Sequence, residues 1–301
     1  TDTSHGKAKI LEVKGDRVRA ALAEGKVAVI AGFQGVSLDK EITTLGRGAS
    51  DLTASALAKT LGADACEIYT DVTGVFTADP RVVPQARKLA RISFDAMLEM
   101  AGAGSKVLAM RSVEFARNHN VPLHVRSSFT WETGTLVTDE EDNMEDPIIS
   151  GVVTDMSESK VTIVGVPDRP GISAAVFEPL AEANVNVDMI VQNAAHAGAA
   201  DITFTVQRDE TQNAVRTLQP VLKKLGGGDV KAFDNIAKLS VVGVGMRTHA
   251  GVAAALFTAL GDKGINIQLI GTSEIKITLA VDRAKADEAV RAAHEAFGLS
   301  K

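Results

Sequence analysis

The chain of 301 residues contains a single cysteine, Cys66, and aromatic residues make up only 4% of it. One cysteine excludes an intramolecular disulfide, and we expect a reducing, cytoplasmic environment. No apolar run approaches the roughly 18 residues that a membrane-spanning helix needs, so no membrane partner is expected. The formal net charge is -6 and the basic residues are scattered. Together with the scarcity of aromatic side chains that could stack on bases, this argues against a nucleic-acid partner.

Residue types that bind metals are also sparse. The six histidines form no cluster, and the sequence contains no Cys/His spacing typical of a metal site. No Ser/His/Asp arrangement can be argued from spacing either. We therefore predict no metal bound by protein side chains and interpret the histidines as structural or exposed.

One segment of the chain occurs twice. Residues 171–193 read GISAAVFEPLAEANVNVDMIVQN and residues 251–273 read GVAAALFTALGDKGINIQLIGTS, with seven identities in twenty-three positions. Each copy follows a short apolar run (161–166 and 239–244) and begins with a glycine before an amphipathic stretch. Each then passes through an asparagine into a β-branched run. The pattern predicts two copies of a strand, helix and strand unit.

The first third of the chain alternates apolar, strand-like runs with helical patterns. We expect strands over 26–33, 65–72 and 121–127, and helices over 52–61, 94–101 and 105–119. Ser50 or Asp51 is suited to begin the first of these helices, Gly62 to end it, and Ser93 to cap the second. Alternation of this kind is typical of an α/β fold with a largely parallel sheet whose strands are buried on both faces.

An acidic, turn-rich segment over 130–147 interrupts this pattern, and we place a domain boundary near Asp146. Ile148–Val153 is expected to form a further strand before the first repeat. Three consecutive glycines, Gly226–Gly228, are expected to mark the joint between the repeats.

A glycine-containing segment, Gly46-Arg47-Gly48-Ala49-Ser50-Asp51, precedes the first of these helices. Free N–H groups and the dipole at a helix amino terminus favour an anion, and Arg47 adds a planar fork for a carboxylate or phosphate. A purely structural capped turn is equally compatible with these residues. The segment is neither a Walker A loop nor a dinucleotide fingerprint.

Polar residues also follow the strand expected over 65–72. Thr70 and Asp71 lie at its carboxyl end, where open α/β sheets bind ligands, although Asp71 is equally suited to cap a turn. Arg81 can contact a phosphate or pair with a surface acid. Lys106 opposes the helix dipole if a helix begins near it, which favours a separate role such as phosphate binding.

In each repeat, a loop before the helix and an asparagine before the second strand are suited to bind a free amino acid. The loops are Asp168–Gly171 and Thr248–Gly251, and the asparagines are Asn186 and Asn266. For one copy alone an ordinary turn would be the better interpretation. Two copies with the same spacing favour a ligand site at their interface.

Several segments in order resemble the aspartokinase family, in particular its actinobacterial type regulated by lysine and threonine. They are TTLGRGASD, EIYTDVTGVFTADPR, GSKVLAMRSVEFARNHNVPLHVRSS and the repeat, whose copies resemble ACT domains. The resemblance spans essentially the whole chain. It implies a partial amino-acid-kinase fold, with helices on both faces of a mostly parallel sheet, over residues 1–146. Two ferredoxin-like α+β ACT units would follow, over 147–235 and 236–301, with strand 148–153 completing the second.

The resemblance implies an ATP-dependent reaction with Mg²⁺ that converts L-aspartate into L-4-aspartyl phosphate, towards lysine, threonine, methionine and diaminopimelate. It places Arg47, Ser50 and Asp51 at the aspartate site, and Thr70, Asp71, Gly74, Phe76, Arg81 and Lys106 at the nucleotide site. It also implies that Asp168, Gly171, Gln192, Asn266 and Ile267 bind an effector, lysine and/or threonine. These effector sites would lie between the ACT units of a homodimer or hetero-oligomer.

The sequence departs from the family pattern at several places. The amino-terminal Lys-x-Gly-Gly-Thr/Ser segment and the aspartate-binding glutamate are absent, so we expect a segment upstream of Thr1 and no aspartate phosphorylation by this chain alone. Ala49 replaces a glycine, and we expect its methyl group to block the backbone conformation of the anion-binding turn. Leu52 and Thr73 also differ from the usual residues.

Two other functions are compatible with the same residues. One is a non-catalytic regulatory subunit that senses lysine or threonine and begins at an internal start such as Met144. The other is an amino-acid kinase acting on a different carboxylate, such as glutamate or N-acetylglutamate. The two ACT-like repeats make this last possibility the weakest of the three.

Overall fold

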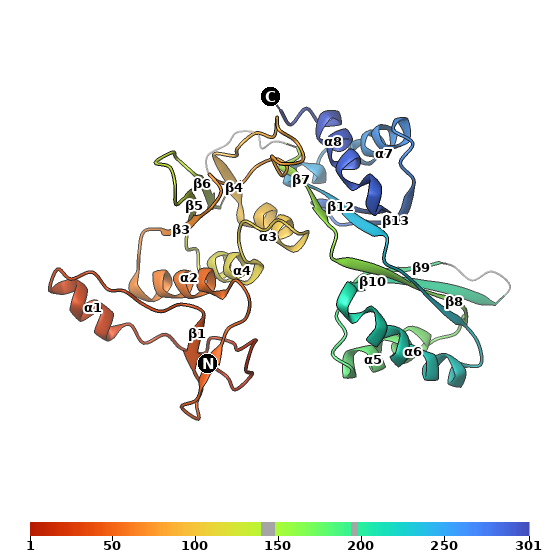
Figure 1. Cartoon of the computed structure of the whole chain (residues 1–301), viewed down its shortest axis with the longest axis horizontal. Coiled ribbons are helices and arrows are strands. Elements are labelled where there is room, and N and C mark those ends of the chain that lie inside the picture. Colours follow the sequence, from red (N-terminus) through yellow and green to blue (C-terminus); the bar gives the residue numbers. More distant parts are fainter. Residues whose placement is uncertain (140–147, 194–197, 301) are drawn as a thin grey trace. The chain divides into compact units, whose positions relative to one another are not determined.

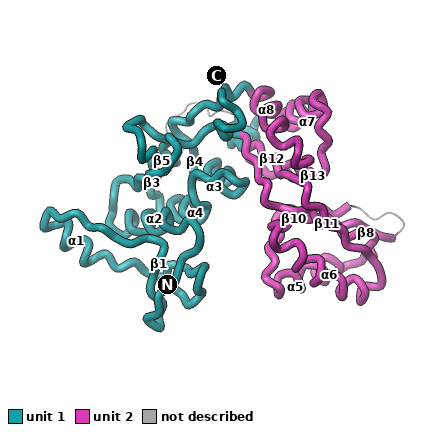
Figure 2. The backbone as a smooth tube through the Cα atoms, viewed as in Figure 1, with its two compact units in different colours: residues 1–151, 242–249, 298–301 teal, residues 152–241, 250–297 magenta. Residues whose placement is uncertain are grey.

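The computed structural model describes residues 1–139, 148–193 and 198–300. The chain divides into two compact units, shown in different colours in Figure 2. The first unit comprises residues 1–151, 242–249 and 298–301, and the second comprises residues 152–241 and 250–297. The expected boundary at Asp146 and the internal start at Met144 lie outside the described residues.

The first unit contains a four-stranded sheet with the strand order β3-β5-β6-β4 (Figure 1). Its strands are β3 (Cys66–Thr70), β4 (Arg91–Ser93), β5 (Leu123–Ser127) and β6 (Thr135–Thr138). The pairs β3–β5 and β4–β6 are parallel, whereas β5 and β6 are antiparallel. The helices are α1 (Asp16–Ala23), α2 (Ala49–Leu61), α3 (Phe94–Gly102) and α4 (Met110–Asn118), and β1 (Gln34–Val36) and β2 (Ile42–Thr44) form a separate hairpin.

Alternation along β3 shows which face of this sheet is buried. Cys66 and Ile68 are buried, while Glu67 and Tyr69 on the opposite face are exposed. The expected α/β fold is confirmed, but β3 is covered on one face rather than two. An exposed face requires polar or amphipathic side chains, and Glu67 accepts hydrogen bonds there from Tyr69 and Arg126.

The strand expected over 26–33 is wrong. These residues form no strand, and the side chains of Val27 and Val29 are 90% and 95% exposed. Phe33 has a φ of 72°, outside the extended region. An apolar run becomes a strand only when a neighbouring strand satisfies its backbone groups, and none of the described strands pairs with this run.

Three helix boundaries test the predicted caps. Gly62 ends α2 in the left-handed conformation, and the Ser93 hydroxyl accepts a hydrogen bond from Ala96 N at the start of α3, so both predictions are confirmed. The predicted start of α2 is wrong, because its N-cap is Gly48 with a φ of 72° rather than Ser50 or Asp51.

The helix expected from residue 105 begins later, at Met110. Ala109, the N-cap of α4, has extended backbone angles of φ -70° and ψ 128°. Lys106 therefore lies in the segment before the helix rather than in its first turn.

The second unit contains two four-stranded sheets, each belonging to one repeat (Figure 1). The pairs β8–β10, β9–β10, β8–β11 and β13–β14 are antiparallel. The first has the order β11-β8-β10-β9, and the second has the order β13-β14-β12-β7. The first repeat comprises β8 (Glu158–Pro167), α5 (Ile172–Glu182), β9 (Val187–Gln192), β10 (Ala199–Gln207), α6 (Thr211–Leu225) and β11 (Asp229–Phe233). The second comprises β12 (Ile236–Val242), α7 (Val252–Asp262), β13 (Ile267–Thr272), β14 (Lys276–Asp282), α8 (Ala286–Ala296) and the earlier strand β7 (Gly151–Asp155).

The predicted strand, helix and strand unit is confirmed in both repeats. The two helices begin after Gly171 and Gly251, whose φ angles are 91° and 94°. Only glycine adopts this region readily, so the shared glycine has a direct structural reason. Leu180 and Leu260 lie at equivalent positions of α5 and α7, and both are fully buried.

The triple glycine does not separate the repeats. Gly226 ends α6 with a φ of 85°, and the chain continues into β11, which pairs with β8 of the first sheet. The first repeat therefore ends after β11, and the connection to β12 consists of residues 234–235. Across the described residues, no helix has the length and apolar character that a membrane crossing requires.

Candidate functional site

The segment 45–51 turns into α2 through two glycines with positive φ, Gly46 at 104° and Gly48 at 72°. The expectation that Ala49 would block this turn is wrong. Ala49 is the first residue of α2, and its buried methyl group packs with Ala8, Leu45 and Leu52. The substituted position requires helical rather than left-handed backbone angles, so a Cβ is accommodated without strain.

Hydrogen bonds from Ala109 and Arg111 tie this turn, and Ala8 beside it, to the start of α4. Asp51 Oδ2 accepts a bond of 3.3 Å from Ala109 N. In the opposite direction, Arg111 donates from Nη1 to Leu45 O at 2.5 Å and from Nη2 to Ala8 O at 3.0 Å. The amino ends of α2 and α4 are thereby held side by side.

This arrangement suits the binding of an anion. The amino ends of two helices, which are the positive ends of their dipoles, converge on one region. Arg47 and Ser50 are exposed at its edge and can contact a ligand. Burial raises the pKa of Asp51, and the hydrogen bond from Ala109 N partly offsets that rise.

A second group of predicted residues lies at the carboxyl end of β3. Thr70 Oγ1 donates to Asp71 Oδ1 at 3.1 Å, and Ser128 N donates to Thr70 O at 2.8 Å. Gly74 has a φ of 147°, and a Cβ built there would approach Thr135 Oγ1 to 2.5 Å. Gly74 is therefore required by backbone geometry and close packing, whatever ligand binds nearby.

The two predicted cations of the nucleotide site differ in their surroundings. Arg81 forms a two-pronged pair with Asp79, with Nε–Oδ1 at 3.0 Å and Nη2–Oδ2 at 2.7 Å. The Arg81 guanidinium lowers the pKa of Asp79 by these hydrogen bonds. Lys106 is exposed in the segment that leads into α4, and Phe76 pairs in a short bridge with Lys88.

The fit of a metal can be judged from the side chains. Among the described residues, no group of three or more His, Cys, Asp or Glu side chains could hold an ion. A magnesium ion that keeps several waters and is bound mainly through nucleotide phosphates needs only one or two carboxylates. Asp71, exposed at the end of β3, is of the right type.

The predicted effector residues of the first repeat gather at the amino end of α5. Gly171 is the N-cap of this helix, and Asp168 precedes it in an exposed loop. Ser173 Oγ, in the first turn of α5, donates to Gln192 Oε1 at 3.0 Å. The end of β9 is thus joined to the start of the helix, and a helix amino end beside an amide is suited to bind the carboxylate of an amino acid.

The remaining two effector residues belong to the second repeat. Asn266 is exposed, and Ile267 is the first residue of β13. They lie at the opposite end of their strand from Thr272, the position equivalent to Gln192. Their role stays a prediction.

Two residues with notable tertiary contacts do not follow from the sequence patterns above. Arg111 lies in the first turn of α4, where a cation opposes the helix dipole, as a lysine at position 106 would if the helix began there. Lys238 is buried in β12 with a side chain 3% exposed. A lysine directly before the apolar run 239–244 is the available signal for it.

Comparisons with known proteins agree with this architecture. Residues 1–127 match the amino acid kinase family, and residues 161–221 and 239–297 match the ACT domain. The aspartate kinase of Pseudomonas putida is 54% identical over 300 residues, covering 99% of this chain and 73% of that protein. The aspartokinase of Mycolicibacterium smegmatis is 53% identical over 304 residues, covering 99% of this chain and 72% of that protein.

Among solved structures, E. coli aspartokinase III in complex with aspartate and ADP superposes with a TM-score of 0.80 at 26% identity. The match covers 98% of this chain and 67% of that chain. Identity above half over nearly the whole chain, together with the order of the matched domains, decides the assignment. The chain belongs to the aspartokinase family and combines an amino-acid-kinase region with two ACT domains.

Proposed function

We propose that the protein transfers the γ-phosphoryl group of ATP to the side-chain carboxylate of L-aspartate, with Mg²⁺, in the cytoplasm. The reaction serves biosynthesis of the aspartate-derived amino acids, including lysine and threonine. The observation that carries this proposal is the pairing of the amino ends of α2 and α4 through Asp51 and Arg111.

The chain's own residues would act by positioning and by neutralising charge. Arg47 and Ser50 at the start of α2 would bind aspartate, and Asp51 would hold the turn in place through Ala109 N. Thr70, Asp71, Gly74, Phe76, Arg81 and Lys106 would surround the nucleotide. Bound Mg·ATP supplies the phosphoryl group. Because phosphoryl transfer needs little covalent help from a protein, a fixed geometry between the two sites accounts for most of the catalysis.

The second unit would sense lysine and/or threonine at Asp168, Gly171, Gln192, Asn266 and Ile267. E. coli aspartokinase III has been solved in complex with lysine and aspartate, and it superposes on this chain with a TM-score of 0.72 at 27% identity. We propose that the effector sites lie between ACT units of two subunits, in a homodimer or hetero-oligomer.

A coupled ADP-release assay tests the catalytic proposal. It uses the product of the complete reading frame that carries this chain. We expect aspartate-dependent turnover, and Arg47→Ala should raise the KM for aspartate by about tenfold or more, because a charge-assisted carboxylate contact is lost. Lys59→Ala, in the last turn of α2, is the matched control and should leave kcat and the KM for aspartate unchanged. Aspartate-independent ADP release would reject the substrate assignment.

Arg111 separates positioning from direct contact. Arg111→Lys retains the charge but loses the fork that reaches two carbonyl groups, Leu45 O and Ala8 O. We expect kcat to fall by about tenfold, with a smaller change in the KM for ATP. Unchanged kcat in a folded variant would show that the pairing of the two helix ends is not needed for turnover.

A further inference from the structure

The two repeats can be aligned strand by strand from their internal contacts. In the first repeat, Thr162 Oγ1 and Thr203 Oγ1 lie 3.1 Å apart between β8 and β10. In the second, Ser240 Oγ and Thr278 Oγ1 lie 3.0 Å apart between β12 and β14. This shared hydroxyl pair sets Thr162 equivalent to Ser240. The strands are offset by two residues relative to the helices, because the chain from Ser240 to the start of α7 is two residues longer than the chain from Thr162 to the start of α5.

The same alignment makes two lysines equivalent, Lys160 in β8 and Lys238 in β12. The helix-strand repeat also makes Asp188 in β9 equivalent to Gln268 in β13. Each lysine contacts the other repeat, at Asp188 in one case and at Gln268 in the other. Lys238 pairs with Asp188, and Lys160 Nζ donates to Gln268 Oε1 at 2.6 Å. The two contacts are therefore related as across a two-fold axis: the lysine of each repeat contacts the residue of the other repeat at the position equivalent to Asp188 or Gln268.

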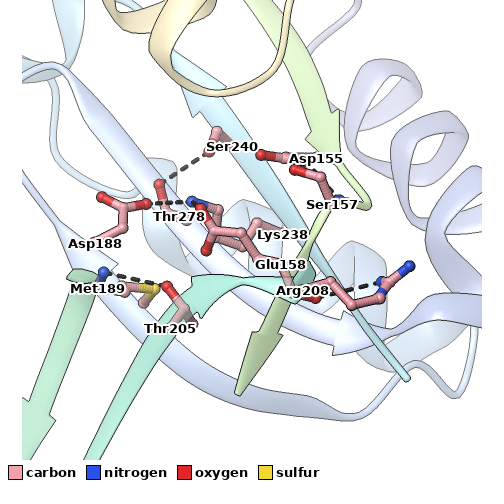
Figure 3. Close-up of polar contacts among 10 residues, drawn as sticks. All are labelled: Asp155, Ser157, Glu158, Asp188, Met189, Thr205, Arg208, Lys238, Ser240 and Thr278. Atoms are coloured by element: carbon pink, nitrogen blue, oxygen red, sulfur yellow. Dashed lines mark hydrogen bonds and ion pairs between the residues drawn. The ribbon is translucent and has the colours of Figure 1, made fainter. Parts of the chain in front are cut away.

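The two exchanged contacts differ in charge. Figure 3 shows Lys238 between the carboxylates of Glu158 and Asp188, and Lys238 Nζ lies 2.6 Å from Glu158 Oε1. Burial opposes ionisation of Lys238, but the hydrogen bonds to Asp188 and Glu158 outweigh it and raise its pKa. Lys160 instead meets a neutral amide and lies 4.7 Å above the Phe233 ring, and burial lowers its pKa.

We propose that Lys238 is a positioning residue for amino-acid binding in the first repeat, acting through Asp188 on strand β9. The inference rests on the proposed effector function and deepens it. It assigns to the second repeat a defined role in shaping the first repeat's ligand site.

The position of β9 supports this role. It is an edge strand, hydrogen-bonded to β10 alone within its sheet. Its carboxyl end carries Gln192, which contacts Ser173 at the amino end of α5. Asp188 lies four residues earlier on the same strand, about 13 Å away at 3.3 Å per residue. Strand β9 joins the two residues, and its register with β10 shifts between Val187 and Ile190, beside Asp188. A tether at Asp188 holds the strand at this irregularity and so restricts where Gln192 lies.

Met189, the residue after Asp188 on β9, makes further contacts. Met189 N donates to Thr205 Oγ1 at 3.2 Å, as Figure 3 also shows. Met189 also lies against Gly271 of β13, where an added Cβ would come within 2.8 Å of its Cε atom. Thus β9 contacts both β12 and β13 of the second repeat, and the charged contact through Lys238 is the one that a substitution can remove selectively.

Calorimetry with L-lysine and with L-threonine on the full chain tests the inference. The variant is Asp188→Ala, chosen because the side chain is 62% exposed and its removal leaves the buried pair of Lys238 and Glu158 intact. We expect the Kd of the effector that binds to rise by about tenfold. The control is Gln268→Ala, the same truncation at the equivalent position, which should change the Kd less than Asp188→Ala does.

The readout also separates positioning from stability. Asp188→Ala should leave the melting temperature within a few degrees of the parent while the Kd rises. Lys238→Met combined with Glu158→Met and Asp188→Ala removes all three charges, and should fold and bind as weakly as Asp188→Ala. An unchanged Kd in either folded variant would overturn the proposal.

If the parent chain binds neither amino acid, the proposed effector function fails. The positioning role is then decided by hydrogen exchange of the β9 amides. Asp188→Ala should increase their exchange by about tenfold relative to Gln268→Ala. Equal exchange in the two variants would overturn the positioning role independently of any ligand.

Discussion

In the first repeat, the fourth strand of the sheet is β11, which follows the repeat's own second helix. In the second repeat the same place is taken by β7, which precedes the first repeat in the chain. The two copies thus share one plan of strands and helices and differ in where the last strand comes from. A sheet position accepts any segment whose pattern and register fit, so chain order need not follow domain order.

The copies differ also in the chemistry of their exchanged contacts. Lys238 is held by two carboxylates, whereas Lys160 donates to a neutral amide. We therefore expect the two equivalent contacts to contribute unequally to the free energy of unfolding. The two repeats thus share the geometry of the exchanged contacts, while the side chains that make them differ in charge. The predictions below each test one part of that difference.

The largest expected effect is that of Lys238→Met. This change leaves Glu158 buried without its partner and should reduce the free energy of unfolding by about 3–5 kcal/mol. Lys160→Met should cost about 1 kcal/mol, the value of an ordinary hydrogen bond. Urea denaturation followed by circular dichroism measures both. Equal losses would mean that the contacts of Lys238 and Lys160 contribute equally to the free energy of unfolding.

Core truncation should affect both repeats by the same amount. Leu180→Ala and Leu260→Ala each remove a fully buried side chain at equivalent helix positions, and each should cost about 2–5 kcal/mol. Differential scanning calorimetry of the two variants provides the measurement. A loss in only one of the two variants would show that the equivalent leucines do not contribute equally to stability.

The glycines before the helices allow a finer comparison. Gly171→Ala and Gly251→Ala meet no atom within 4 Å, so the cost comes from the positive φ alone and should be about 1–2 kcal/mol in each case. Only Gly171→Ala should also weaken effector binding, because Gly171 belongs to the proposed site. Calorimetric titration of both variants checks this, and equal affinities would remove Gly171 from the site.

The smallest expected effect is a difference in pH dependence. Burial lowers the pKa of Lys160, so the folded chain loses this proton before the unfolded chain does. Its contribution to the free energy of unfolding therefore rises as the pH increases through the lowered pKa towards about 10.4. For Lys238 the pKa is raised, so its contribution is complete below about 10.4 and is lost as the pH rises through the raised value.

Urea titrations at several pH values between about 8 and 11 test the sign. The stability of the parent chain relative to Lys160→Met should increase over this range. A constant difference would show that the environment of Lys160 does not oppose its charge.

Local signals predicted much of this structure from the sequence. Ser93 at the start of α3, Gly62 at the end of α2 and the glycines before α5 and α7 were identified because caps depend on nearby backbone groups. The apolar run over 26–33 does not form the expected strand, because a strand depends on a neighbour that local sequence does not specify. Helix α4 begins later than the sequence predicts, because Ala109, which carries no capping side chain, bonds to Asp51 far away in the sequence.

The sequence by itself determined the repeated strand and helix units, since hydrophobic periodicity and glycines at turns act over a few residues. The order of motifs along the chain also indicated the resemblance to the aspartokinase family. The resemblance also implied that a strand over 148–153 completes the second sheet, and β7 (Gly151–Asp155) does so. Only the tertiary structure decided that Arg111 joins two helix ends and that Lys238 meets Asp188. These contacts connect residues 50 or more positions apart, and such pairings depend on how whole elements pack rather than on any local pattern.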